Sequence, residues 1–120
     1  MTFQTFTQAQ SEAAVRLLLA GRRQDGVVAL AEGHAFDREI QALPWNAEHE
    51  LHYFVVTEAA RIRNTLATQR REFLAEQCAC FRTSTEKETV LNMLIRVVSA
   101  DGIAPKESTF VAEVQQLFKA

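Results

Sequence analysis

Four carboxylates stand near two Asp-Gly dipeptides, each of which follows an apolar helical segment. Asp25 and Asp101 directly precede a glycine, and Glu32 and Glu107 follow them by seven and six residues. The unequal spacing means that the two copies are not in strict register. If pseudo-twofold packing brings both turns together, the four side chains form a hard oxygen site, which suits calcium or magnesium. We therefore predict a divalent-metal site at Asp25, Glu32, Asp101 and Glu107.

Neither Asp-Gly turn matches an EF-hand calcium loop. With Asp25 at the fifth loop position, the first and third positions are Gly21 and Arg23, which cannot ligate calcium. The second turn fails the same alignment. A purely structural role also stays open, because glycine commonly closes a helix and acidic side chains favour the positive N-terminus of the next one. The expected metal site is accordingly weak.

Other metal-ligand and nucleophile types are few. His49 and His52 are three residues apart on an expected helix, but His34 is the only other histidine, so we expect surface histidines. Cys78 and Cys80 would point about 200° apart on a helix, which disfavours a disulfide between them. We interpret both as small buried residues. The sequence has no glycine-rich phosphate loop and no nucleophile elbow, so we predict that the protein is not an enzyme.

Arg61, Arg63, Arg70 and Arg71 make a basic run in a protein of net charge −2. Such a run is usually a solvated helix face, so we expect it to be exposed and unimportant for stability. The alternative is an anionic partner: phosphate, nucleic acid or lipid headgroups. The net charge gives no case for a nucleic-acid binder, and no nucleic-acid partner is expected.

Helical periodicity dominates the chain, with no convincing alternation of period two. It predicts helices over about 7–22, 29–43 and 47–82, a fourth that ends at Asp101-Gly102, and a fifth from Pro105 onward. A straight helix over 47–82 would measure about 54 Å, which exceeds the diameter of about 35 Å expected for a compact chain of this length. We therefore predict a break between Arg61 and Arg71, near Asn64 to Thr68.

The fourth helix carries its own start and packing signals. Thr85 has a glutamate three residues later, Glu88, which is the spacing of a capping box, and Ser84 is the other candidate cap. The buried stripe of this helix is expected at four apolar positions: Leu91, Leu94, Ile95 and Val98.

Composition bounds the fold class. The chain has 120 residues, 48% of them hydrophobic and 23% charged, with only four glycines and two prolines. This composition suits a globular protein with a core and argues against an all-β sandwich with many tight turns. We predict an all-α fold: one domain over residues 1–120, with five to six helices and two pseudo-repeated helix–Asp-Gly–helix units. The sequence shows no membrane span and no secretory signal, so we expect a cytoplasmic protein.

The stretch from Leu91 to Phe118 carries Arg96, Ala100-Asp101-Gly102 and Glu107, and it resembles the second half of a tellurite-resistance TerB-like domain. The stretch from Val15 to Leu43 resembles the first half more weakly. The resemblance implies a helical bundle of two pseudo-repeats, acidic residues that bind metal ions, and a role in bacterial stress response or ion resistance alongside membrane partners. The chain departs from the family pattern at Val27-Val28-Ala29 and Ile103-Ala104, where polar or acidic residues are usual.

These observations lead to a functional hypothesis and one alternative. The hypothesis is a non-enzymatic bacterial stress-response module that binds a divalent cation weakly, a partner protein, or both, through its acidic turns. The resemblance to TerB-like domains implies that this partner is membrane-associated. The alternative is a ligand-free helical adaptor in which the Asp-Gly turns are structural.

Overall fold

The computed structural model describes residues 6–22, 30–45, 50–99 and 105–119. Within these residues the chain forms five α-helices and no strand, which confirms the all-helical prediction. The helices are α1 (Gln8–Arg22), α2 (Leu30–Gln41), α3 (Leu51–Cys78), α4 (Ser84–Val98) and α5 (Pro105–Lys119). Across the described ranges, no helix is both long enough and apolar enough to cross a membrane.

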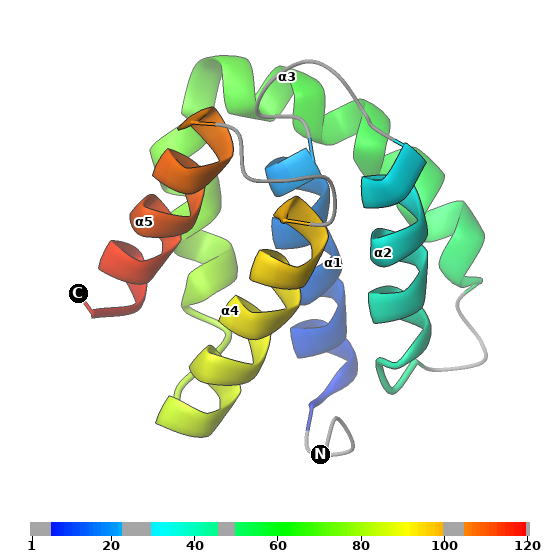
Figure 1. The fold of residues 1–120 in the computed structure, drawn as a ribbon, viewed down its shortest axis with the longest axis horizontal. Helices are drawn as coiled ribbons and strands as arrows, with labels where there is room; N and C mark the ends of the chain where they lie inside the picture. Colours follow the sequence, from blue (N-terminus) through cyan, green and yellow to red (C-terminus); the bar gives the residue numbers. More distant parts are fainter. Residues whose placement is uncertain (1–5, 23–29, 46–49, 100–104, 120) are drawn as a thin grey trace.

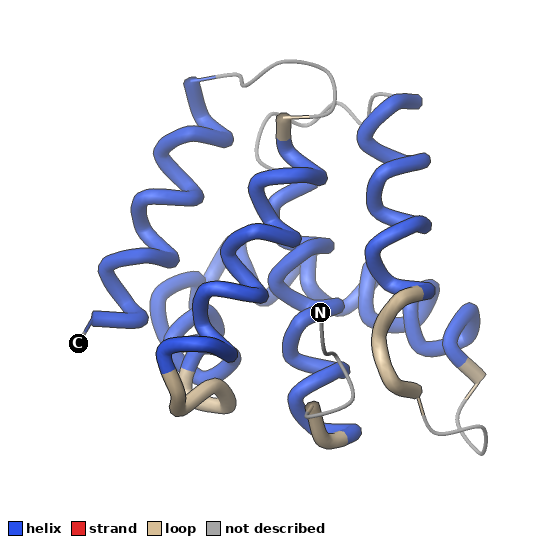
Figure 2. Tube along the Cα trace, turned by 60° about the horizontal axis from the view of Figure 1, so that its bottom comes forward, coloured by secondary structure: helices blue, strands red, loops and turns tan. Residues whose placement is uncertain are grey.

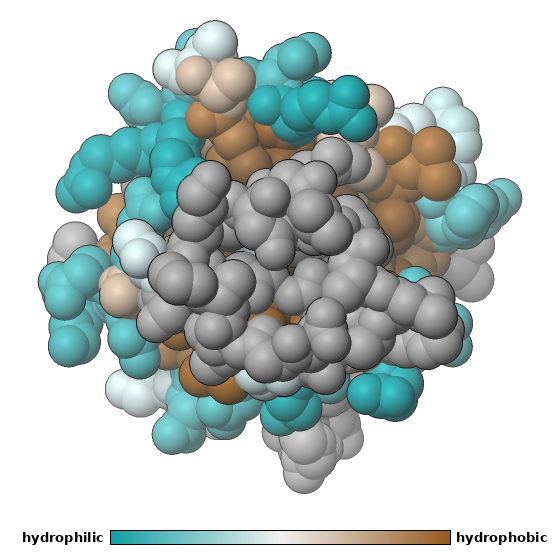
Figure 3. All heavy atoms as spheres, turned by 45° about the horizontal axis from the view of Figure 1, so that its top comes forward, coloured by the Kyte–Doolittle hydropathy of each residue, from teal (hydrophilic) through white to brown (hydrophobic). Residues whose placement is uncertain are grey.

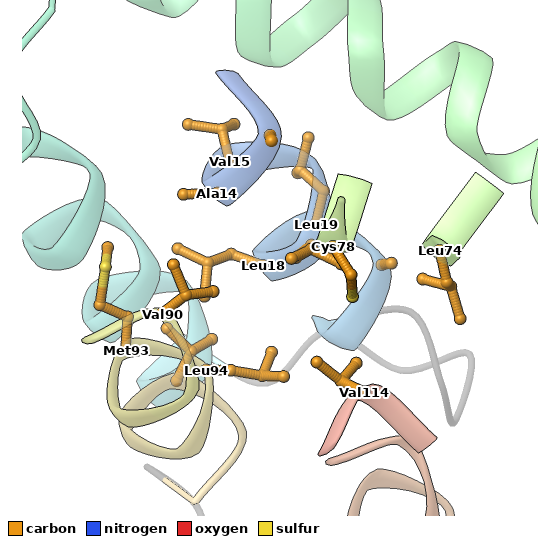
Figure 4. Packing of buried hydrophobic residues seen from close by; sticks show 14 of the residues in the cluster. Ala14, Val15, Leu18, Leu19, Leu74, Cys78, Val90, Met93, Leu94 and Val114 are labelled. Atoms are coloured by element: carbon orange, nitrogen blue, oxygen red, sulfur yellow. The ribbon is translucent and has the colours of Figure 1, made fainter. Parts of the chain in front are cut away.

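Helix α1 lies at the centre of the molecule and contacts all four other helices (Figure 1). Its residues from Ala13 to Ala20 are buried on every side except at Arg16. In the core, Leu18 of α1 lies near Val90 and Leu94 of α4, while Cys78 of α3 lies beside Leu19 (Figure 4). A helix that is apolar on all sides is stable in water only when other elements bury it. The other four helices therefore surround α1.

Helix α3 crosses behind the other four helices, and its two halves run in different directions (Figures 1 and 2). Gln69 has non-helical backbone angles, φ −136° and ψ 42°, which divide the helix. A straight helix of its 28 residues would be about 42 Å long, whereas the longest extent of the molecule is 34 Å. The predicted break between Arg61 and Arg71 is confirmed, and it lies one residue beyond the narrower window that ended at Thr68.

The N-cap of α4 lies one or two residues before the predicted position. Thr83 is the N-cap: its hydroxyl accepts a hydrogen bond from the backbone N–H of Glu86, and the Glu86 carboxylate accepts one from the backbone N–H of Thr83. This reciprocal pair is a capping box. The cap expected at Ser84 or Thr85 is therefore wrong in position, although the type of signal was correct.

The buried side of α4 also differs from the prediction. Ile95 was expected in the core but is 37% exposed, and Leu91 is half-buried. Successive residues of a helix point about 100° apart. The core contacts the side of α4 that carries Leu94 and Val98, and Ile95 lies at the edge of that side and faces solvent. The buried stripe consists of Val90, Met93, Leu94, Val97 and Val98.

Candidate functional site

The two aspartates of the predicted metal site, Asp25 and Asp101, lie outside the described residues. Glu32 and Glu107 belong to α2 and α5, but their side chains also fall outside the described part of the chain. Each glutamate is the third residue of its helix. The two glutamates thus match each other in helix position, although their distances from the preceding aspartates differ.

The helix ends that flank the two Asp-Gly dipeptides pack against one another. A Cβ atom added at Gly21, in the last turn of α1, would lie 2.8 Å from Cδ1 of Leu94 and 3.3 Å from both Cγ1 of Val98 and Cε2 of Phe110. The end of α1 is therefore in close contact with the end of α4 and the first half of α5. The C-terminal ends of α1 and α4 and the N-terminal ends of α2 and α5 lie at the same end of the bundle (Figure 1).

An ion pair joins α4 to α2 on this side of the core. Arg96 donates hydrogen bonds from Nε and Nη2 to the two carboxylate oxygens of Glu39, at 2.8 and 2.9 Å. The hydrogen bonds to Glu39 raise the pKa of the Arg96 guanidinium. This bidentate geometry orients both side chains, which is why arginine suits it better than lysine. Arg96 is thus occupied by a structural partner, Glu39.

No group of three or more His, Cys, Asp or Glu side chains that could hold a metal occurs in the part of the chain that the structure describes. His52 is exposed on α3, in agreement with the expected surface histidines, while the side chains of His34 and His49 are not described. Both cysteines are free thiols. Burial raises the pKa of Cys78 to about 12, so this thiol stays protonated at neutral pH and is a poor nucleophile.

A charged cluster that the sequence analysis missed joins α1 to α3. Arg16 donates from Nε to Oε1 of Glu58 at 2.8 Å and from Nη1 to Oε1 of Gln77 at 3.2 Å. Arg61 contacts the same Glu58 oxygen at 2.7 Å. Burial acts to raise the pKa of Glu58, but the hydrogen bonds from Arg61 and Arg16 outweigh it and hold the pKa below its ordinary value.

Arg16 is the sequence feature that could have indicated this cluster. It is a charged residue inside an otherwise apolar run, and its guanidinium also lies 5.3 Å from the ring centroid of Phe54. Each polar group in the cluster is bound to another polar group, so the arrangement ties the helices together and leaves little free capacity for a ligand.

The basic run divides into two kinds of arginine. Arg63 and Arg71 are exposed, as predicted. Arg70 is different, because its Nη2 atom lies 2.7 Å from Oε1 of Glu113 and its guanidinium carbon lies 5.7 Å from the ring centroid of Phe110. The expected exposure is therefore wrong for Arg70, which is half-buried and paired, while its effect on stability stays a prediction.

Two surface cavities flank the turn between α3 and α4, with volumes of about 450 and 480 Å³. The first has Phe81, Phe118 and Lys87 among its lining residues, and the second has Gln10 and Cys80; Arg82 lines both. Among the residues that the structure describes, no carboxylate or histidine lines either cavity. Lys87 is also engaged, since its Nζ donates to the Phe118 carbonyl at 3.0 Å.

The sequence matches no family model, no curated protein and no solved structure.

Proposed function

We propose that the protein is a non-enzymatic bacterial stress-response module resembling TerB, which binds a divalent cation weakly through Asp25, Glu32, Asp101 and Glu107. The observation that supports this proposal is the close packing at Gly21 between the ends of the helices that flank the two Asp-Gly dipeptides. The two Asp-Gly dipeptides follow helix ends that belong to one packed region, which favours a common ion for their carboxylates.

The matched positions of the two glutamates add to this argument. A glutamate at the third position of each helix, following an Asp-Gly turn, is what two pseudo-repeated helix–Asp-Gly–helix units require. Calcium and magnesium both take carboxylate oxygens, and calcium takes six to eight of them in typical protein sites. The apolar residues after each Asp-Gly supply no side-chain oxygen, so the affinity is low. The same acidic end would then present a partner protein, membrane-associated by the family resemblance, with a surface whose charge depends on the cation.

The second candidate is a ligand-free adaptor in which the turns are structural. The ion pair between Arg96 and Glu39 and the apolar contacts around Gly21 support it, because they already hold the helix ends together without an ion. In that case the two glutamates serve the helix N-termini, where negative side chains are favourable.

Thermal unfolding with added cations separates the two candidates. Protein treated with EDTA would be melted with millimolar calcium, magnesium, manganese or zinc, each added separately. Binding to the folded state at a hundredfold excess over Kd stabilises by about 2.7 kcal/mol, which for a domain of this size raises the melting temperature by about 10 °C. We expect such a shift for at least one ion, and its loss in the Asp101→Asn, Glu107→Gln double variant.

The matched control is the Asp37→Asn, Glu88→Gln double variant. It also removes two negative charges, and both of its residues are exposed carboxylates of α2 and α4 outside the proposed site. This control should keep the shift. No shift with any ion, or equal shifts in wild type and the Asp101→Asn, Glu107→Gln variant, would leave the adaptor as the function.

A further inference from the structure

The cavity of about 450 Å³ lies at the end of the bundle opposite the Asp-Gly dipeptides. The first turn of α4 and the last turn of α5 lie at this end, with the end of α3 behind them (Figure 1). These three helices and the turn between α3 and α4 supply its wall. The volume falls within the range of about 300–1,000 Å³ that is typical of small-molecule sites. We name it the α3–α5 cavity.

Most of the wall of the α3–α5 cavity is apolar. The burial of Cys78 raises the pKa of its thiol to about 12, so this side chain is uncharged at neutral pH and counts with the apolar ones. Such a wall takes up an alkyl chain by the hydrophobic effect. The uncharged lining residues are Ala75, Cys78, Ala79, Phe81, Leu117 and Phe118.

Two positive side chains complete the wall. Arg82 is exposed and forms no ion pair with any carboxylate in the described ranges. Lys87 gives one hydrogen bond to the Phe118 carbonyl, at 3.0 Å, which leaves two of the three N–H donors of its ammonium group. Among the described lining residues, Arg82 and Lys87 are the only charged ones.

Three carboxylates of the neighbouring elements are engaged outside the α3–α5 cavity. Glu86 accepts two hydrogen bonds from backbone N–H groups at the α4 cap, at 2.9 and 3.2 Å. Glu113 is bound by Arg70 at 2.7 Å. Glu76 accepts a hydrogen bond from the side chain of Gln77 at 3.4 Å. None of the three lines the cavity.

The other charged residues on the surrounding parts of α3, α4 and α5 are exposed and also lie outside the wall. They comprise two of each sign, so their charges cancel in sum: Arg71, Glu72, Glu88 and Lys119. Arg82 and Lys87 therefore determine the sign of the charge that a ligand meets in the cavity. Glu86, next to Lys87, offsets one of these two positive charges, which favours a ligand with a single negative charge.

We propose that the α3–α5 cavity binds a single-chain amphiphile with a carboxylate head group, that is, a medium-chain fatty acid. The alkyl chain contacts Phe81, Leu117 and Phe118, and the carboxylate accepts hydrogen bonds from Arg82 and Lys87. A planar guanidinium matches a carboxylate in geometry, which favours this head group. The cavity shares no residue with the proposed cation site and requires no ion. The proposal therefore extends beyond the proposed function and can be tested with EDTA present.

Isothermal titration calorimetry with three ligands tests the chain and the head group. Decanoate represents the proposed ligand, hexanoate has the same head group on a shorter chain, and decyltrimethylammonium has a long chain with a positive head group. We expect one decanoate per protein chain, bound at least about tenfold more tightly than either of the others. Hexanoate loses the contacts of four CH₂ groups, and the cation is repelled by Arg82 and Lys87. The preference over the cation should shrink at high salt.

Substitutions in the wall test the location. Ala75→Phe fills the α3–α5 cavity from an exposed position on α3, and it should weaken decanoate binding by about tenfold or more. Arg82→Gln and Lys87→Gln each remove one positive charge. Each should weaken decanoate binding by about threefold to tenfold and reduce the preference over decyltrimethylammonium. Circular dichroism melts establish that each variant is folded.

Matched controls come from exposed residues outside the α3–α5 cavity. Ala67→Phe places the same ring at another exposed alanine of α3, and Arg63→Gln neutralises another exposed arginine. Ala9→Phe places the ring at an exposed residue that lines the other cavity, beside Gln10 and Cys80. All three variants should bind decanoate like wild type.

Equal affinities for decanoate and hexanoate, or for decanoate and decyltrimethylammonium, would overturn the proposal, as would no binding of decanoate. Unchanged binding by folded Ala75→Phe, or a loss of binding in Ala9→Phe instead, would place the ligand elsewhere and overturn it too. Uptake of several decanoates per chain together with loss of the helical signal would show detergent action only, with the same consequence.

Discussion

At the scale of single residues, the basic run shows how neighbouring arginines acquire different roles. Arg71 is exposed, whereas Arg70 reaches Glu113 and the ring of Phe110 on α5. The Glu113 side chain is only 24% exposed, so its carboxylate has lost most of its contact with water. The hydrogen bonds from Arg70 replace that contact. Arg70 therefore joins the second half of α3 to α5 by both charge and packing.

We expect Arg70→Ala to lower the free energy of unfolding by about 1–1.5 kcal/mol, because it removes an ion pair and an arginine–aromatic contact and leaves a half-buried carboxylate unpaired. Arg63→Ala, the matched control, should change it by less than about 0.5 kcal/mol. Urea unfolding followed by circular dichroism measures both. Equal effects of the two substitutions would show that the Arg70 contacts contribute nothing to stability.

The sequence could not distinguish Arg70 from Arg63. Both lie in the same polar stretch, and the partner that separates them, Glu113, is 43 residues away. Helical periodicity reports which side of a helix is apolar, but it does not report which distant charge will face that helix. The sequence did not predict the Arg16–Glu58 cluster for the same reason: Arg16 is visible as a charge within an apolar run, but periodicity does not identify its partner. The four carboxylates of the proposed metal site were identified from a local sequence pattern, and their convergence on one ion stays a prediction.

At the scale of elements, periodicity and length predicted the helices and the break in α3. The observed bounds of α1 and α5 begin within one residue of the predicted starts, because Thr7 and Pro105 are strong local signals. The local pattern at the start of α4 fits two caps, since both Thr83 and Thr85 have a glutamate three residues later. Tertiary packing decides between them: Phe81 is 2% exposed and contacts the rings of Phe6 and Phe118, which fixes the chain just before Thr83.

Thr83→Ala should cost about 1 kcal/mol of folding stability, as the loss of an N-cap side chain usually does. Thr85→Ala, two residues on, removes the same hydroxyl type from a position that caps nothing and should stay within about 0.5 kcal/mol of wild type. Thermal melts of both variants decide the matter. A larger loss for Thr85→Ala than for Thr83→Ala would place the functional cap at Thr85 after all.

At the scale of the whole molecule, the bundle is held where several helices meet rather than by any one pair. Hydrophobic side chains reach the surface in places between hydrophilic ones (Figure 3), while the core remains a single cluster to which all five helices contribute. Gly21 is one such meeting point, because a side chain there would collide with residues of both α4 and α5.

We expect Gly21→Val to destabilise the protein by about 1–3 kcal/mol, the usual cost of forcing extra carbon atoms into a packed core. Ala9→Val provides the control, since Ala9 is exposed on the same helix and the substitution introduces the same branched side chain without a clash. Denaturant unfolding should show a clearly larger loss for Gly21→Val. Equal losses would mean that the contacts around Gly21 can yield without cost.

The central position of α1 has a consequence for how the protein is made. The ribosome releases α1 before α3, α4 and α5, yet these later helices cover most of its surface. Until they emerge, a helix with apolar residues on nearly every side has nothing to pack against, and such a nascent segment is prone to aggregate or to engage a chaperone. Folding of this chain must therefore wait until α3 and α4 have emerged, and a chain that stalls before α4 should be a substrate for quality control.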